Sequence, residues 1–200
     1  MNIILIIEMI GTVAFAVSGA SVAVKKKMDV LGVAALGMTT AVGGGIIRDL
    51  ILGITPPTAF QEPVYALLSV VVSLIVFIPK IREWVLSTEN NAVLLIMDSL
   101  GLAVFTVVGV RAGMPFGNRF LAVFVGALTG VGGGILRDLF AGDRPYVFIK
   151  HFYACASLIG AIVAAALWGF GEEIAMTCGA VVVLVLRLLA AIFKWSLPKA

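Results

Sequence analysis

The sequence AVGGGIIRDL occupies residues 41–50, and the closely similar sequence GVGGGILRDL occupies residues 130–139. Gly132 follows Gly43 by 89 residues, and the agreement continues to a glycine three residues beyond each copy. Self-similarity at a fixed spacing indicates an internal duplication. The fold of this chain is therefore expected to contain two copies of one structural unit.

A second pair of matching segments lies upstream of the two motifs. They are Glu8-x-x-Gly11-x-x-x-Phe15-x-x-x-Gly19 and Asp98-x-x-Gly101-x-x-x-Phe105-x-x-x-Gly109. Their offset is 90 residues, so one residue is missing from the first loop of the second copy. We therefore place repeat one at residues 1–79 and repeat two at residues 90–170, with residues 173–194 as an extra helix. Tyr65 and Tyr153 are expected to be counterparts in the third helices.

The composition places both repeats in a membrane. Of the 200 residues, 62% are hydrophobic and 12% are charged, and the mean hydropathy is +1.16. A soluble protein of this size could not bury so much apolar surface. We predict an all-α integral membrane protein with seven transmembrane helices in a single membrane domain, residues 1–200. The apolar segments are 3–24, 29–52, 61–79, 92–112, 117–141, 149–170 and 173–194, and residues Pro79 through Asn91 are expected to form a loop.

Each repeat holds three spans, so the second copy must enter the membrane from the opposite face. Inverted repeats are common in transport proteins, and their functional sites lie near the midplane between the repeats. The chain is thus expected to combine two inverted three-helix repeats with a seventh helix.

Lysine and arginine in short loops predict the orientation. With the N-terminus outside, nine basic residues face the cytoplasm and two, Arg111 and Arg119, face outward. The nine are Lys25, Lys26, Lys27, Lys80, Arg82, Arg144, Lys150, Lys194 and Lys199. We predict a multi-pass inner membrane protein with a cytoplasmic C-terminus.

Glycine triplets weaken the second and fifth predicted helices, because glycine costs about 1 kcal/mol relative to alanine in a helix interior. The residues are Gly43, Gly44, Gly45, Gly132, Gly133 and Gly134. One interpretation is close helix packing, which small residues permit. The other is a kink or opening that exposes backbone carbonyls to a pathway. The symmetric placement of the triplets favours the second interpretation.

Charged residues follow each triplet directly: Arg48 with Asp49, and Arg137 with Asp138. Charges at membrane depth must be paired, hydrated or near an interface. Symmetry predicts the ion pairs Glu8–Arg48 and Asp98–Arg137, with either a structural or a transport role. Neighbouring residues point to different faces of a helix, so we expect Asp49 and Asp138 near the pathway mouths, where they would favour cations.

Other site types are not indicated. The basic residues are scattered, so no nucleic-acid partner is expected, and the sequence has no phosphate-binding loop, zinc spacing or nucleophile elbow. We expect no enzyme activity, no cofactor and no metal beyond transient potassium.

The duplicated Gly-Gly-Gly-Ile-x-Arg-Asp-Leu motifs, together with the Phe15–Gly19 and Phe105–Gly109 segments, resemble the prokaryotic trimeric intracellular cation channel family. The resemblance covers nearly the whole chain. It implies a homotrimer in membrane lipid, with one pore in each protomer between the two glycine-kinked helices, permeable to potassium and other monovalent cations.

Two alternatives remain open at this point. Bacterial relatives also carry a glycine-transporter label, which implies a secondary transporter for a small amino acid such as glycine. A carrier needs a compact pocket for a carboxylate, whereas a channel needs only a continuous polar path with weak sites. A membrane scaffold without transport activity predicts a dry, fully packed interface between the repeats.

Overall fold

The structure is a computed structural model that describes residues 3–87, 92–148 and 152–195. Within these ranges the chain forms helices and no strand. The helices are α1 (Ile3–Lys25), α2 (Val30–Ile51), α3 (Thr58–Gln61), α4 (Val64–Phe77), α5 (Pro79–Ser87), α6 (Ala92–Gly113), α7 (Arg119–Phe140), α8 (Tyr153–Leu167) and α9 (Glu172–Ile192), with short 3-10 turns η1 (Met114–Phe116), η2 (Tyr146–Phe148) and η3 (Trp168–Phe170). The predicted all-α fold is confirmed.

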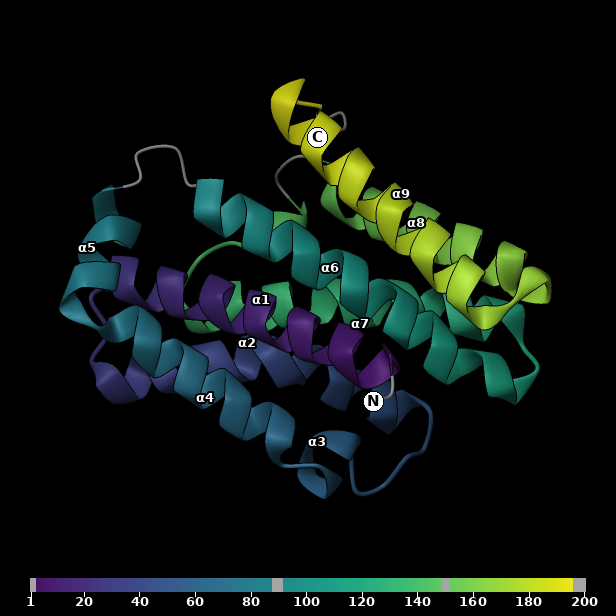
Figure 1. Ribbon diagram of the computed structural model, residues 1–200, viewed down its shortest axis with the longest axis horizontal. Helices are drawn as coiled ribbons and strands as arrows, with labels where there is room; N and C mark the ends of the chain where they lie inside the picture. Colours follow the sequence, from purple (N-terminus) through teal and green to yellow (C-terminus); the bar gives the residue numbers. More distant parts are fainter. Residues whose placement is uncertain (1–2, 88–91, 149–151, 196–200) are drawn as a thin grey trace.

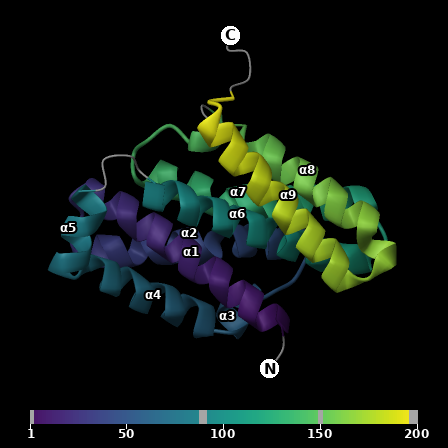
Figure 2. The same cartoon turned by 45° about the horizontal axis from the view of Figure 1, so that its top comes forward.

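The helices form two bundles of three that meet at the centre of the molecule (Figure 1). Helices α1, α2 and α4 pack together, and α6, α7 and α8 form the corresponding group. Contacts of α1 with α6 and of α2 with α7 join the two bundles, and α9 lies against α6 and α8 (Figure 2). The motif helices α2 and α7 thus contact each other where the two bundles meet.

In the part of the chain that the structure describes, six helical segments are long and apolar enough to cross a membrane on their own. The predicted third span is not one long helix. Helix α4 is only 14 residues long, and α5 is bent away from it by 77°. A 14-residue helix extends about 21 Å, which is less than the roughly 30 Å of a hydrocarbon core. The prediction of a loop at residues 79–91 was partly wrong, because residues 79–87 form helix α5. Pro79 begins α5, a position that suits proline because no helical N–H is needed there.

The motif helices begin and end in the same way in both repeats. The side chain of Asp29 accepts a hydrogen bond from the Gly32 N–H at the start of α2, and Asn118 caps α7 equivalently. Each helix ends before a glycine with positive φ, +72° at Gly53 and +73° at Gly142. A side chain at either glycine would be strained. The duplication therefore fixes both ends of α2 and α7.

Some sequence expectations fall outside the described residues. They concern Lys150 and Lys199 in the count of basic residues, Asn91 at the end of the expected loop, and the start of the predicted span 149–170.

Candidate functional site

Helices α2 and α7 touch at their glycine triplets. A Cβ added at Gly44 would collide with the carbonyl oxygen of Thr129, and one at Gly133 would collide with the carbonyl oxygen of Thr40. A Cβ at Gly132 would lie 3.2 Å from the Cα of Gly44. The two backbones therefore approach at a distance that only glycine allows.

The opening expected at the triplets is not present in this structure, because α2 and α7 are uninterrupted helices. Close packing, the other interpretation, describes the contacts of Gly44, Gly132 and Gly133. A Cβ at Gly43 would press on the Leu136 side chain. A direct path between α2 and α7 is likewise closed at this crossing, since backbone atoms of the two helices fill it.

An ion cluster lies at the C-terminal end of α7. Arg137 Nη1 lies 2.5 Å from Asp98 Oδ1 on α6 and donates to the hydroxyl of Ser18 on α1 at 2.6 Å. Its Nε donates to Asp138 Oδ1 at 2.8 Å. The Asp98–Arg137 pair predicted from symmetry is confirmed. The side chains of Arg137 and Asp98 are almost fully buried, at 3% and 4% exposure. We call Arg137 and its partners Asp98, Asp138 and Ser18 the inner cluster.

The repeat-one counterpart is arranged differently. Arg48 Nε donates to Asp49 Oδ1 at 2.7 Å, while Glu8 accepts a hydrogen bond from the hydroxyl of Tyr65. The predicted Glu8–Arg48 pair was wrong: no ion pair joins these residues in the described chain. The contact between the arginine Nε and the adjacent aspartate is the same in both repeats. The position equivalent to Ser18 is Val108, which offers Arg48 no hydroxyl.

Asp49 and Asp138, which the sequence placed near pathway mouths, are both buried, and Asp49 lies in the wall of a cavity at the end of α2. Asp49 is 0% exposed and Asp138 is 6% exposed. Asp49 Oδ2 accepts a hydrogen bond from the backbone N–H of Thr58 at 2.7 Å. Asp138 Oδ2 accepts one from the backbone N–H of Tyr146 at 2.6 Å. The two aspartates therefore hold the neighbouring arginine and fix the loop that follows each motif helix.

Arg187 on α9 belongs to the inner cluster, and sequence reasoning did not include it. It is 0% exposed, its Nη2 lies 3.9 Å from Asp98 Oδ2, and its guanidinium lies 4.6 Å from the centre of the Tyr153 ring. Burial raises the pKa of the nearby Tyr146 phenol, which remains neutral at physiological pH. Repeat symmetry could not identify Arg187, because α9 has no counterpart. The signal available was a charged residue inside an apolar segment.

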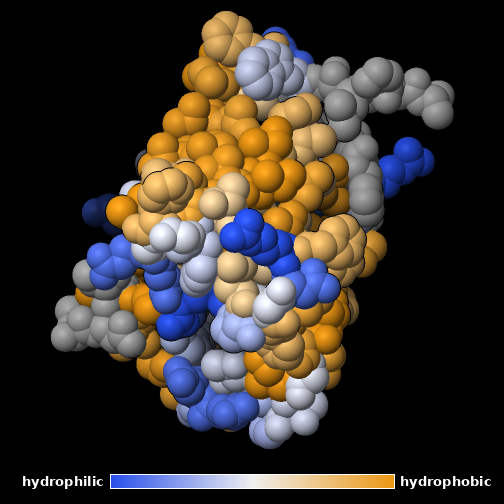
Figure 3. Space-filling model, turned by 90° about the vertical axis from the view of Figure 1, so that its right-hand side faces the viewer, coloured by the Kyte–Doolittle hydropathy of each residue, from blue (hydrophilic) through white to orange (hydrophobic). Residues whose placement is uncertain are grey.

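A cavity of about 390 Å³ opens at the end of the molecule where α1 begins and α2 ends. Its lining includes Glu8, Arg48, Glu62, Tyr65 and Arg111. Figure 3 shows this end of the molecule, where hydrophilic residues surround a hollow between hydrophobic surfaces. We call it the outer cavity.

The outer cavity continues inward as a narrower space of about 50 Å³. Glu8, Arg48 and Tyr65 line both spaces, and Thr12, Gly45 and Phe105 line the inner one. Gly45 thus differs from Gly44, since a Cβ at Gly45 would meet nothing closer than Arg48 Nη2 at 3.9 Å. Residues of α1, α2, α4 and α6 line these two spaces.

The acidic residues of the outer cavity are not all neutralised. Arg48 pairs with Asp49, and Arg111 pairs with Glu172 at 2.5 Å. In the described ranges, Glu8 and Glu62 have no basic nitrogen within 4.0 Å. The cavity therefore carries excess negative charge, which attracts cations.

Comparison with known proteins agrees with this arrangement of two halves. A family model described as "Glycine transporter" matches residues 5–80 and 95–169. A solved TRIC cation channel is 38% identical over 100% of this chain and 98% of that chain, with a TM-score of 0.89. The chain belongs to the prokaryotic trimeric intracellular cation channel (TRIC) family.

Further known proteins are similar to this chain over more than 90% of their own length. The TRIC orthologue from Rhodobacter sphaeroides is 34% identical over 96% of this chain and 99% of that chain, with a TM-score of 0.88. The UPF0126 membrane protein YvgT of Bacillus subtilis is 36% identical over 96% of this chain and 94% of the relative. The inner membrane protein YadS of Escherichia coli is 37% identical over 96% and 93%, respectively.

Proposed function

We propose that this chain is a monovalent cation channel of the inner membrane that conducts potassium through one path in each protomer of a homotrimer. The observation that supports this most strongly is the negatively charged outer cavity, which reaches from the surface to Thr12 and Gly45. Relatives of the same fold are TRIC cation channels. The proposed path follows α1, α2, α4 and α6 in its outer half.

Side-chain chemistry in the cavity suits a weakly bound cation. Glu8 supplies a carboxylate, and Thr12 and Tyr65 supply hydroxyl oxygens. Conduction requires sites that attract an ion without retaining it. A few oxygens around an open cavity meet that requirement better than a closed cage would.

Neutralising Glu8 should reduce the potassium conductance. Glu8→Gln removes one negative charge from the cavity wall, so at low salt we expect roughly half the unitary current. The difference should shrink near 1 M salt, where the Debye length is about 3 Å. Recordings from purified protein in planar bilayers at several salt concentrations provide the measurement.

The matched control for this experiment is Glu83→Gln, because Glu83 is exposed on α5, outside the cavity. Equal currents in the parent protein and Glu8→Gln at low salt would contradict a role for the outer cavity in conduction.

A glycine carrier is the second candidate, and the family model described as "Glycine transporter" favours it. Glycine is a zwitterion, so a carrier needs both a cation and an anion in the pocket. Arg48 and Glu8 both line the cavity, but Asp49 occupies the Nε of Arg48. Direct binding of a glycine carboxylate would have to compete with that aspartate.

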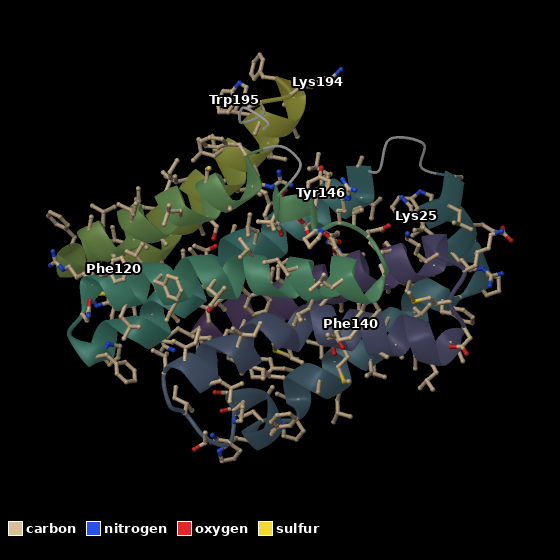
Figure 4. All side chains as sticks on the ribbon, turned by 180° about the vertical axis from the view of Figure 1, so that it is seen from behind. Lys25, Phe120, Phe140, Tyr146, Lys194 and Trp195 are labelled. Carbon is tan, nitrogen blue, oxygen red and sulfur yellow. The ribbon has the colours of Figure 1, made fainter. Side chains whose placement is uncertain are left out.

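The proposed orientation places the N-terminus outside. Lys26 lies 2.5 Å from Asp143, and Arg111 pairs with Glu172, so each pair joins two loops assigned to the same side. In Figure 4, Lys25, Tyr146 and Lys194 lie along the upper and right-hand parts of the molecule, and Phe120 lies at the left. These groupings support the division of the loops into two faces.

Cysteine accessibility tests the orientation. In a background without Cys155 and Cys178, an impermeant thiol reagent added outside intact cells should label Glu172→Cys and leave Lys26→Cys unlabelled. Labelling should be reversed in inverted membrane vesicles. Outside labelling of Lys26→Cys but not of Glu172→Cys would show that the orientation is inverted.

A further inference from the structure

Two phenylalanines meet at the centre of the protomer. Phe15 on α1 and Phe105 on α6 occupy equivalent positions in the two repeats. Their ring centroids are 5.2 Å apart, with an angle of 33° between the ring planes. Phe15 is 1% exposed and Phe105 is 8% exposed. The duplication thus brings two large apolar rings into contact where the repeats face each other.

The pair separates the outer cavity from the inner cluster. Along α1, Thr12 lies one turn before Phe15 and lines the cavity. Ser18 lies one turn after Phe15 and contacts Arg137. Along α6 the order is reversed, with Asp98 in the inner cluster and Phe105 on the cavity wall. Polar groups therefore lie on both sides of an apolar layer.

Glycines provide the space that the rings occupy. A Cβ at Gly101 would collide with the Phe15 ring, and one at Gly133 would lie 2.9 Å from Phe15 Cε2. A Cβ at Gly11 would lie 3.2 Å from Phe105 Cε2. Gly133 of the second triplet, together with Gly101 and Gly11, thus leaves room for the two rings between the helices.

We propose that Phe15 and Phe105 form the hydrophobic barrier that controls ion passage, a proposal that rests on the channel function above. An ion that crosses an apolar constriction must lose water without gaining oxygen ligands, and such constrictions close by dewetting. Phe15 is held between Gly101 and Gly133, whereas Phe105 borders the cavity. Opening therefore moves the Phe105 ring toward the cavity and lets water reach the inner cluster.

Substitutions at Phe105 test the barrier by size and polarity. Potassium flux into proteoliposomes should rise in the order Phe, Leu, Ala, Asn at this position. Phe105→Asn should raise the flux roughly tenfold, because a polar side chain keeps the constriction wet. The matched control is Phe120→Asn, since Phe120 is 79% exposed on α7, away from the barrier (Figure 4).

The fold of each variant is checked by its thermal unfolding and its size on gel filtration. If Phe105→Asn does not fold, the order of potassium flux among the Phe, Leu and Ala proteins still tests whether Phe105 forms the barrier. Equal flux for folded Phe, Leu and Ala proteins, where the parent conducts, would overturn the barrier and leave the channel function standing. A parent and variants that all carry no potassium would contradict both proposals.

Discussion

Replacing Arg137 with alanine is expected to lower the free energy of unfolding by about 3–5 kcal/mol, the usual cost of leaving a buried charge without its partner. Arg137 contacts Asp98, Asp138 and Ser18 at once, and its side chain is 3% exposed. Without Arg137, the buried carboxylates of Asp98 and Asp138 would have less positive charge beside them. Unfolding of the purified protein in detergent, followed by circular dichroism, measures the change.

Two further variants separate the ion pair from general packing. Asp98→Asn in the Arg137→Ala background should recover part of the loss, because it removes the unpaired carboxylate. Arg48→Ala is the matched control, since the Arg48 side chain is 11% exposed and lies beside the outer cavity. It should lower the free energy of unfolding clearly less than Arg137→Ala does. Strictly additive effects of Asp98→Asn and Arg137→Ala would show that the two residues do not interact.

Alanine substitutions in the glycine triplets are expected to have opposite effects at adjacent positions. Gly44→Ala places a methyl group against the Thr129 carbonyl, and Gly133→Ala places one against Thr40 and Phe15. Backbone atoms cannot move aside cheaply, so each should destabilise the protein by at least the roughly 1–3 kcal/mol typical of overpacking. The double variant should prevent α2 and α7 from packing.

Gly45→Ala is the matched control within the same triplet. Its Cβ would meet no atom closer than 3.9 Å, and alanine favours a helix over glycine by about 1 kcal/mol. It should therefore stabilise the protein or leave its stability unchanged. Thermal unfolding of the three single variants measures the difference. Equal destabilisation by Gly44→Ala and Gly45→Ala would contradict the packing described here.

The sequence could predict features that the duplication repeats exactly. The helix ends at Gly53 and Gly142 follow from one local rule applied twice, and symmetry correctly paired Asp98 with Arg137. The same symmetry was wrong for Glu8 and Arg48, since Glu8 accepts a hydrogen bond from Tyr65 and Arg48 pairs with Asp49. The two clusters differ at several places, because repeat one has Glu8 in place of Asp98 and Val108 in place of Ser18, and only the inner cluster contacts Arg187.

Other features depended on contacts that no pattern in the sequence encodes. The glycine triplets predicted either close packing or an opened helix, and only the approach of Thr40 and Thr129 distinguishes these for Gly44 and Gly133. Arg187 joins the inner cluster from a helix outside the repeats. The sequence placed the end of the third apolar segment at Pro79, where α4 is followed by α5, but it did not indicate that residues 79–87 form a helix.

The central claim is that the chain conducts potassium, and the most direct measurement is unitary current from purified protein in planar bilayers. Glycine uptake driven by an ion gradient is measured in parallel on proteoliposomes from the same preparation. We expect discrete potassium currents that reverse near the potassium equilibrium potential, with no accumulation of glycine. Gradient-driven glycine uptake, without unitary potassium current over a broad voltage range, would contradict the channel and favour the carrier.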